Sequence, residues 1–488
     1  MNSEKTKTPI SSEKEGKLMS LSKITSLFFW LLFLSNSSIL IYNFPNIPEW
    51  HYQSIIRING FTLVIWTIVT FFSAIVNTYA SDYLKGFKFQ ARFTGLCIGF
   101  TVSVMLFIAS NHLAPLLLSW FAMGFFMSRL IGVNADWQEA KKAAKYSQRY
   151  FLLSGAFLSV GVLLLAYQSN YYTLSLINSN INTLPKATLF IASICIIVSA
   201  IIQSAIYPFH RWLLSAMTAP TPASALMHAG FVNGSGILLS LFAGILFASH
   251  TLSILFIIGG ITAITAQFAK LIQVNVKQKL ACSTIAQMGF MIMQCGLGFF
   301  NAAVVHLILH GFYKAYLFLS AGENVNYTEP KDAEKIQIKP LQAVVVLVYG
   351  LLGALLFTQL TGKGTEINSG IFLTLIVAIT VGQVTYNIVK QKNFSAWQKI
   401  FIPPVLFLSS IALYALMYRG VTALMADMPK VDAPSPLSTI QIVFGIIFLI
   451  GFFIMKLNIY KKIPWLYVKL LNDSQSAKNT LLLFKNHS

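Results

Sequence analysis

Charged residues are scarce in this chain, and their scarcity excludes most soluble folds. Only 10% of the 488 residues are Asp, Glu, Lys or Arg, whereas 56% are hydrophobic, and the mean hydropathy is +0.68. A soluble chain of this length carries about a quarter charged residues to cover its surface. The composition therefore predicts an integral membrane protein.

Cysteine is also sparse, and its positions exclude two kinds of stabilised domain. The four cysteines lie in apolar stretches and form no CxxC pair or metal-ligand spacing: Cys97, Cys195, Cys282 and Cys295. Neither a disulfide scaffold nor a zinc site is expected within the chain. We predict no metal site and no bound cofactor.

Acidic side chains are missing from the apolar segments. The chain has 15 carboxylates, and all of them fall outside the runs that could span a membrane. A proton pump of the usual kind relays charge through buried acids. Any ion path here is therefore expected to use basic side chains, amides and water.

Long apolar runs are abundant, and runs of roughly 17 to 25 residues can cross a bilayer as helices. Fourteen spans are predicted, although 13 is an alternative count: 24–43, 61–80, 93–109, 113–133, 150–167, 187–207, 221–247, 252–273, 284–301, 303–320, 341–360, 369–389, 401–418 and 437–456. The fold class is therefore all-α, a polytopic membrane helical bundle with at least one broken helix. No cleaved signal peptide is expected, because no small-x-small cleavage site follows the first apolar run.

The positive net charge of +20 follows this topology. With the N-terminus in the cytoplasm, 28 of the 35 basic residues lie on the cytoplasmic side and five lie on the opposite side, while Arg129 and Lys314 fall within spans. Cytoplasmic loops of membrane proteins carry such an excess of Lys and Arg. We therefore expect both termini in the cytoplasm and no nucleic-acid partner.

Prolines interrupt one apolar region. Pro208, Pro220 and Pro222 fall within fifteen residues, and each would remove a backbone donor from a helix. A discontinuous helix is expected, and membrane proteins tolerate such breaks only where protein or a water-filled cavity satisfies the backbone. His228 and Asn233 follow the prolines and are expected to lie near such a cavity. The alternative for His228 is a hydrogen-bonded packing role.

A second group of ionisable side chains falls within one span. His306, His310 and Lys314 are spaced by four residues, so that they share one stripe of a helix. Ionisable groups inside a membrane are costly unless they line water or a partner, and histidine exchanges protons near neutral pH. We predict a proton or cation relay. Structural hydrogen bonding is one alternative, and a zinc site, for which no third ligand lies nearby, is another.

The segment between these two groups contains Lys277 and Lys279, followed by Ser283 and Thr284. Lysines at this position are typical of an anchor on the cytoplasmic side of a membrane. Ser and Thr are favoured helix N-caps. The sequence therefore predicts that Ser283 and Thr284 cap the helix that follows the anchor.

These motifs, in this order, resemble the proton-conducting membrane subunits shared by respiratory complex I, multisubunit cation/proton antiporters and membrane hydrogenases. The segments that carry the resemblance read PTPASALMHA (220–229), KQKLACSTIAQMG (277–289) and HLILHGFYK (306–314). Within that superfamily, PFHRWLLSAMTAPTPASALMHAGFVNGSG, AQMGFMIMQCGLGFF, HGFYKAYLFLSAGE and LYVKLLNDSQSAKNT are most similar to the membrane subunits of DAB inorganic carbon transporters (the DabB type). The resemblance runs from about residue 120 to the C-terminus.

The resemblance implies a transporter subunit rather than an enzyme. Residues 24–456 would form a proton-conducting membrane domain in a bacterial inner membrane, between cytoplasmic tails at 1–23 and 457–488. The domain would conduct H⁺ or Na⁺ and drive a large peripheral partner resembling a zinc-containing β-carbonic anhydrase (the DabA type), which converts CO₂ to bicarbonate. Two alternatives remain: an ion-translocating subunit of a complex I-like or antiporter assembly, and a scaffold that only anchors a soluble partner.

The chain departs from complex I subunits where those subunits are charged. They carry a glutamate after a tryptophan where this chain has Phe121, a lysine where it has Gln203, and an acid where it has Thr218. The missing glutamate–lysine pair argues against a complete pump in this chain alone. The expected ion-path residues are His228, His306, His310 and Lys314. Four more are possible members of the path: Gln203, Asn233, Lys277 and Lys363.

Overall fold

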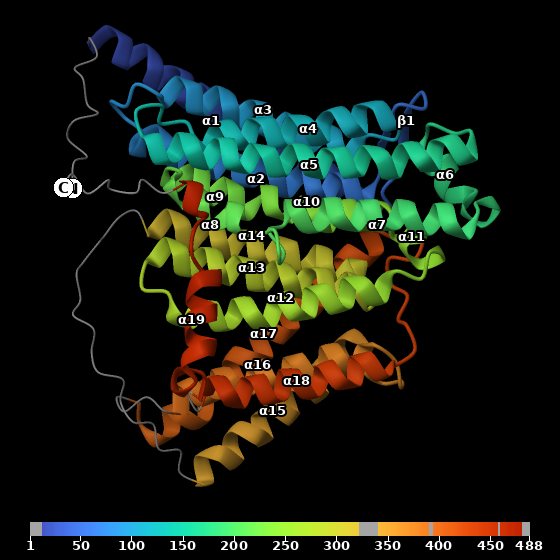
Figure 1. Cartoon of the computed structure of the whole chain (residues 1–488), viewed down its shortest axis with the longest axis vertical. Coiled ribbons are helices and arrows are strands. Elements are labelled where there is room, and N and C mark those ends of the chain that lie inside the picture. The colour runs from blue at the N-terminus through green and yellow to red at the C-terminus, as the bar shows by residue number, and fades with distance from the viewer. Residues whose placement is uncertain (1–11, 322–339, 390–393, 457–458, 481–488) are drawn as a thin grey trace.

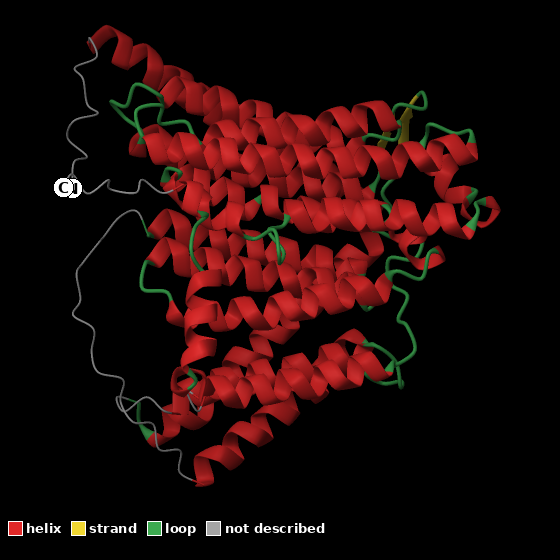
Figure 2. Cartoon of the chain, in the orientation of Figure 1, coloured by secondary structure: helices red, strands yellow, loops and turns green. Residues whose placement is uncertain are grey.

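The computed structural model describes residues 12–321, 340–389, 394–456 and 459–480, and nearly all of them are helical (Figure 2). A short antiparallel hairpin is the one sheet in these ranges, with β1 (Trp50–Tyr52) paired to β2 (Ile56–Ile58). The all-α prediction is confirmed.

Thirteen long helices build the bundle. They are α1 (Ser12–Asn43), α2 (Gly60–Tyr83), α3 (Gln90–Ala109), α4 (Leu113–Ile131), α5 (Gln138–Ser169), α7 (Lys186–Gln203), α12 (Leu252–Ile272), α13 (Val276–Gly296), α14 (Phe300–Ser320), α15 (Pro340–Thr361), α16 (Gly370–Val389), α17 (Ala396–Leu424) and α18 (Thr439–Lys456). Shorter helices complete the described chain: α6 (Leu174–Ser179), α8 (Arg211–Ser215), α9 (Thr221–Ala229), α10 (Gly234–Leu241), α11 (Ala243–Ala248) and α19 (Pro464–Asp473).

Within these ranges, 12 helical segments are long and apolar enough to cross a membrane, with 221–241 counted as one. The two remaining predicted spans correspond to α13, whose first turns carry Lys277 and Lys279, and to α18. All fourteen predicted spans therefore coincide with helices, and the polytopic bundle is confirmed. Helix α1 begins at Ser12, so part of the tail predicted at 1–23 is helical.

The helices lie nearly parallel to one another in layers (Figure 1). Helices α1 to α5 occupy one side of the view, α12 to α14 lie in the middle, and α15 to α18 lie on the other side. Helix α19 crosses the others almost at right angles, at one end of the bundle. Bulky side chains such as Trp120, Trp212 and Phe256 fill the interior and are almost completely buried.

The two ends of the bundle differ in character. We call the end that α19 crosses, where α13 begins with Lys277 and Lys279, the basic end, and the end that carries β1 and β2 the hairpin end (Figure 1). Isolated bridges join the loops at the hairpin end, including Phe299 with Asp432 and His112 with Thr173. At the basic end, hydrogen bonds from Gln273 to Ser474 and from His210 to Asp473 tie the segment 464–480 across the helix ends.

Candidate functional site

The predicted helix break lies in the centre of the bundle. Helix α9 ends at Ala229, a 3₁₀ turn covers Phe231–Asn233, and α10 begins at Gly234. Pro208 lies between α7 and α8, Pro220 is the N-cap of α9, and Pro222 lies in its first turn, where proline costs no hydrogen bond. A discontinuous helix is present, but its break lies at 230–233, after the prolines rather than at them, and the residues between 221 and 240 are almost all buried.

His228 lies in the last turn of α9, directly before this break, and is fully buried. Its ring stacks on Phe318 of α14 at a centroid distance of 4.3 Å. Neither ring nitrogen has a hydrogen-bond partner among the described residues. A packing histidine would normally have both nitrogens satisfied, because a buried polar atom without a partner costs about 1–3 kcal/mol. The environment of His228 therefore favours a group that hydrogen-bonds to water or ions.

The predicted stripe on α14 is present. The rings of His306 and His310 stack with centroids 5.9 Å apart and planes inclined by 17°. The Nε2 atom of each ring is buried and lacks a partner in the described chain. Lys314 follows one turn later and is fully buried. Three ionisable groups thus line one face of a single helix inside the bundle.

Neutral oxygen atoms hold the Lys314 ammonium. Its Nζ donates to the carbonyl oxygen of Leu280 at 3.0 Å and to the Oγ of Ser283 at 2.9 Å, both on α13. No ion pair involves Lys314 within the described ranges. A buried ammonium without a carboxylate is costly to keep charged, since neutral dipoles replace water only partly. Such a group is suited to gaining and losing a proton or to repelling a cation.

The role predicted for Ser283 and Thr284 as helix caps is wrong. Helix α13 begins at Val276, and its N-cap is Asn275, whose side chain accepts from the amides of Lys277 and Gln278. Asn is as good an N-cap as Ser, and it occurs earlier in the chain. Ser283 instead lies two turns inside α13, where it binds Lys314.

Three of the four possible path residues border the buried region around α9 and α10: Asn233, Gln203 and Lys277. The Asn233 side chain donates to the carbonyl oxygen of Ala229 at the break and to that of Leu307 on α14, and its Oδ1 lacks a described partner. Gln203 is buried at the end of α7 with its Nε2 atom also unpartnered among described residues. The Lys277 ammonium donates to the Ala219 carbonyl oxygen, just before α9. Lys277 therefore lies at the start of α13, whereas Asn233 and Gln203 lie at the break.

Lys363 lies elsewhere. It follows α15 at the hairpin end, where its ammonium contacts the Asp432 carboxylate at 2.6 Å and lies 4.3 Å from the centre of the Phe299 ring. The structure does not place it beside His306, His310 or Lys314. Among the described residues, no three His, Cys, Asp or Glu side chains gather closely enough to hold a metal ion. The zinc alternative for the two histidines thus finds no third ligand in that part of the chain.

Neutral groups fill the region where complex I subunits carry charge. The Trp120 indole donates to the Ser154 hydroxyl at 3.2 Å, and Ser154 continues to Ser199 of α7. Ser204, next to Gln203, hydrogen-bonds to Ser235 of α10. Among the described residues around Trp120 and Gln203, the interior therefore contains hydroxyl and amide groups rather than a buried acid and base.

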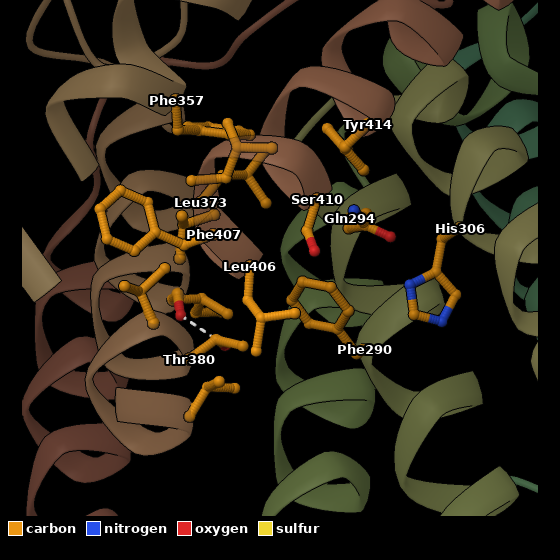
Figure 3. Close-up of a pocket in the computed structure, with 15 residues that line it drawn as sticks. Phe290, Gln294, His306, Phe357, Leu373, Thr380, Leu406, Phe407, Ser410 and Tyr414 are labelled. Carbon is orange, nitrogen blue, oxygen red and sulfur yellow. Dashed lines mark hydrogen bonds between the residues drawn. The ribbon is translucent and has the colours of Figure 1, made fainter. Parts of the chain in front are cut away.

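A cavity of about 320 Å³ opens beside His306, between α13 and α14 on one side and α15 to α17 on the other. His306, Gln294, Ser410 and Tyr414 lie together at one wall, whereas Phe357, Leu373 and Phe407 form the opposite wall (Figure 3). Gln294, Ser410 and Tyr414 were not among the residues predicted from sequence. The four-residue spacing from Ser410 to Tyr414 and Tyr418 on α17 offered a signal for the first two, whereas Gln294 lies on α13 and had none.

Comparisons with known proteins agree with this architecture. Residues 110–381 match the family described as NADH:quinone oxidoreductase/Mrp antiporter membrane proteins. A probable inorganic carbon transporter subunit DabB of Bacillus subtilis is 31% identical over 395 residues, which cover 75% of this chain and 78% of the relative. A probable subunit DabB2 of Halothiobacillus neapolitanus is 30% identical over 376 residues, which cover 76% of this chain and 68% of the relative.

A solved structure shares the fold. The Mrp complex from Dietzia contains a chain that superposes with a TM-score of 0.56 at 18% sequence identity, covering 95% of this chain and 52% of that chain. This chain thus spans about half the length of its structural neighbour. From the family match, the two curated relatives and the helical bundle, it follows that the chain belongs to the NADH:quinone oxidoreductase/Mrp antiporter membrane family and is similar, within it, to DabB inorganic carbon transporter subunits.

Proposed function

We propose that this chain is the membrane subunit of an energy-coupled inorganic carbon uptake complex, in which it conducts H⁺ or Na⁺. The observation that carries the proposal is the buried stripe of His306, His310 and Lys314 beside the broken helix. Its ammonium is bound by neutral oxygens, and its imidazoles keep unpartnered nitrogens in the described interior. The relatives from Bacillus subtilis and Halothiobacillus neapolitanus are named probable inorganic carbon transporter subunits, which supports inorganic carbon as the cargo of the complex.

In this proposal the conversion of CO₂ to bicarbonate takes place on a partner. The partner is a large peripheral subunit resembling a zinc-containing β-carbonic anhydrase, of the DabA type. Ion flow through this chain drives the partner in the direction of bicarbonate. Moving one charge across about 100 mV releases about 2.3 kcal/mol, which corresponds to a concentration ratio of about fifty. A few ions per cycle would therefore sustain a large accumulation of bicarbonate.

We place the basic end in the cytoplasm of a bacterial cell, with the protein in the inner membrane. The excess of Lys and Arg predicted for the cytoplasmic loops supports this orientation. The segment 464–480 lies across the basic end and would face the same compartment as the bicarbonate product. The partner would dock on that side.

Expression in a host that lacks carbonic anhydrase tests the proposal. We expect growth in air when this chain is produced together with a large zinc subunit of the DabA type from the same organism, and no growth with either protein alone. Growth with this chain alone would contradict the division of labour. Ion flux by the purified complex without growth rescue would instead favour the complex I-like or antiporter alternative, and a complex that rescues growth without any ion flux would favour the scaffold alternative.

A further inference from the structure

A second polar stripe faces the cavity from α17. Ser410, Tyr414, Tyr418 and Thr422 are spaced by four residues and therefore share one face of this helix. Ser410 and Tyr414 line the cavity next to His306 and Gln294 (Figure 3). Thr422 accepts a hydrogen bond from Asn301, in the first turn of α14, at 2.6 Å. The α17 stripe therefore runs along α14 from the cavity to the hairpin end.

This stripe ends on a carboxylate. The Tyr418 hydroxyl donates to Oδ2 of Asp432 at 3.0 Å, while Oδ1 of the same carboxylate accepts from Lys363 at 2.6 Å. Asp432 retains 27% exposure of its side chain, and Lys363 retains 11%. The Tyr414 and Tyr418 rings stack with centroids 6.2 Å apart. One partly exposed acid thus connects, through two stacked tyrosines, to the cavity that contains His306.

The stripe on α14 and the stripe on α17 extend from the cavity toward opposite ends of the bundle. On α14, the side chains from His306 to Lys314 lead from the cavity toward the basic end, and on α17 those from Ser410 to Thr422 lead from the cavity toward the hairpin end. The cavity joins them. Most of its lining is apolar, but His306, Gln294, Ser410 and Tyr414 gather at one wall, and their polar atoms provide the hydrogen-bond partners that water would need there. Gln294 Oε1 and His306 Nε2 are both buried there without a described partner, as expected for groups that bind such water.

We infer that Asp432, Tyr418, Tyr414 and Gln294 form the outer half of the ion path and connect His306 to the hairpin end. The inference deepens the proposed function and rests on it, and it favours protons over Na⁺. Hydroxyl and imidazole groups pass a proton by accepting one and releasing another, so that the path is unchanged after each transfer. Asp432 is the entry group, and Lys363 positions its carboxylate.

Ion flux in proteoliposomes tests the inference. The complex is purified through a tag on the full chain, reconstituted with an internal pH-sensitive dye, and energised by a potassium diffusion potential. We expect Tyr414→Phe and Asp432→Asn each to reduce proton flux at least about tenfold. Two matched variants should retain the wild-type flux. Tyr349→Phe loses a hydroxyl that donates to the carbonyl oxygen of Ile400, and Asp427→Asn loses a carboxylate that pairs with Arg57 at the hairpin end.

The outcomes separate the inference from the proposed function. Wild-type flux in both path variants would overturn the α17 route while leaving ion conduction intact. Absence of flux from the wild-type complex would overturn both. The amount of each variant in the membrane and its co-purification with the partner are measured in parallel. Tyr414→Phe removes a single oxygen atom and keeps the ring. Its proton flux therefore decides the outcome if Asp432→Asn fails to fold.

Discussion

At the scale of single residues, the environment of Lys314 explains how a membrane interior without acids can hold a base. Two neutral oxygens of α13 bind its ammonium, and Lys314 forms no ion pair within the described ranges. A buried ammonium without a carboxylate partner carries a desolvation cost that neutral oxygens offset only in part. Lys314 therefore contributes to function at the expense of stability, and the two properties are separable by substitution.

We expect Lys314→Met to abolish ion flux while leaving thermal stability equal or higher. Lys314→Arg keeps the charge but does not release its proton, so it should also fail if the lysine is a proton relay, and it should work if the lysine is only a fixed positive charge. Flux is measured in proteoliposomes and stability by thermal unfolding in detergent. Lys186→Met, at the exposed start of α7, is the control and should behave as wild type. Normal flux in Lys314→Met would show that the stripe of His306, His310 and Lys314 on α14 has only a structural role.

At the scale of helices, close backbone contact holds the site in place. Gly289 of α13 faces Gly259 of α12, and a Cβ atom added at Gly289 would lie 2.7 Å from the backbone nitrogen of Ala263. The same helix α13 carries the two acceptors for Lys314. The α12–α13 contact therefore fixes the position of these acceptors, as small residues at helix interfaces do in membranes generally.

We expect Gly289→Ala to destabilise the protein by about 1–3 kcal/mol, because the clash is with backbone atoms that cannot rotate away. Gly95→Ala on α3 is the matched control, since a Cβ atom there would meet nothing within 4 Å. Thermal unfolding in detergent compares the two variants. Equal unfolding temperatures would show that α12 and α13 separate without cost and would contradict the packing described above.

The segment 464–480 forms a second helical contact, which is expected to depend on pH. The His210 Nε2 atom contacts the carbonyl oxygen of Asp473 at 2.7 Å, and its ring stacks on Tyr207 at 3.8 Å, with Arg211 next to it in the chain. Burial lowers the pKa of His210 below its usual value, and the hydrogen bond to Asp473 offsets only part of that shift. The undocked segment would leave His210 exposed, with an ordinary pKa near 6.5.

Docking of the segment should therefore weaken as the pH falls below about 6.5, because the undocked state binds the additional proton. Above that pH, the contribution of His210 to the stability of the docked segment is fully present. Hydrogen exchange at the amides of 474–480, corrected for intrinsic rates, measures the effect. His210→Gln keeps a donor for Asp473 but does not titrate, and it should remove the pH dependence. An identical pH profile in this variant would assign the dependence to another group.

At the scale of the whole molecule, the sequence predicts the bundle well and the path only in part. Apolar runs and the spacing of His306, His310 and Lys314 are local features, so the spans and the α14 stripe could be read directly. Tyr414 lies beside the cavity that contains His306 only because α17 packs against α14 after more than a hundred intervening residues, and Asp432 reaches this stripe only through its contact with Tyr418. The contact between Ser283 and Lys314 could not be predicted for a similar reason, because it forms only where α13 packs beside α14.

As a whole, the chain is proposed to conduct ions and thereby to energise a partner. The measurement that tests it most directly is accumulation of labelled inorganic carbon in cells that produce the complex, with and without an uncoupler, while ATP is maintained. Collapse of the membrane potential and pH gradient should return internal inorganic carbon to its equilibrium level, as should Lys314→Met in untreated cells. Accumulation that persists in the uncoupler, or in cells producing Lys314→Met, would contradict the account.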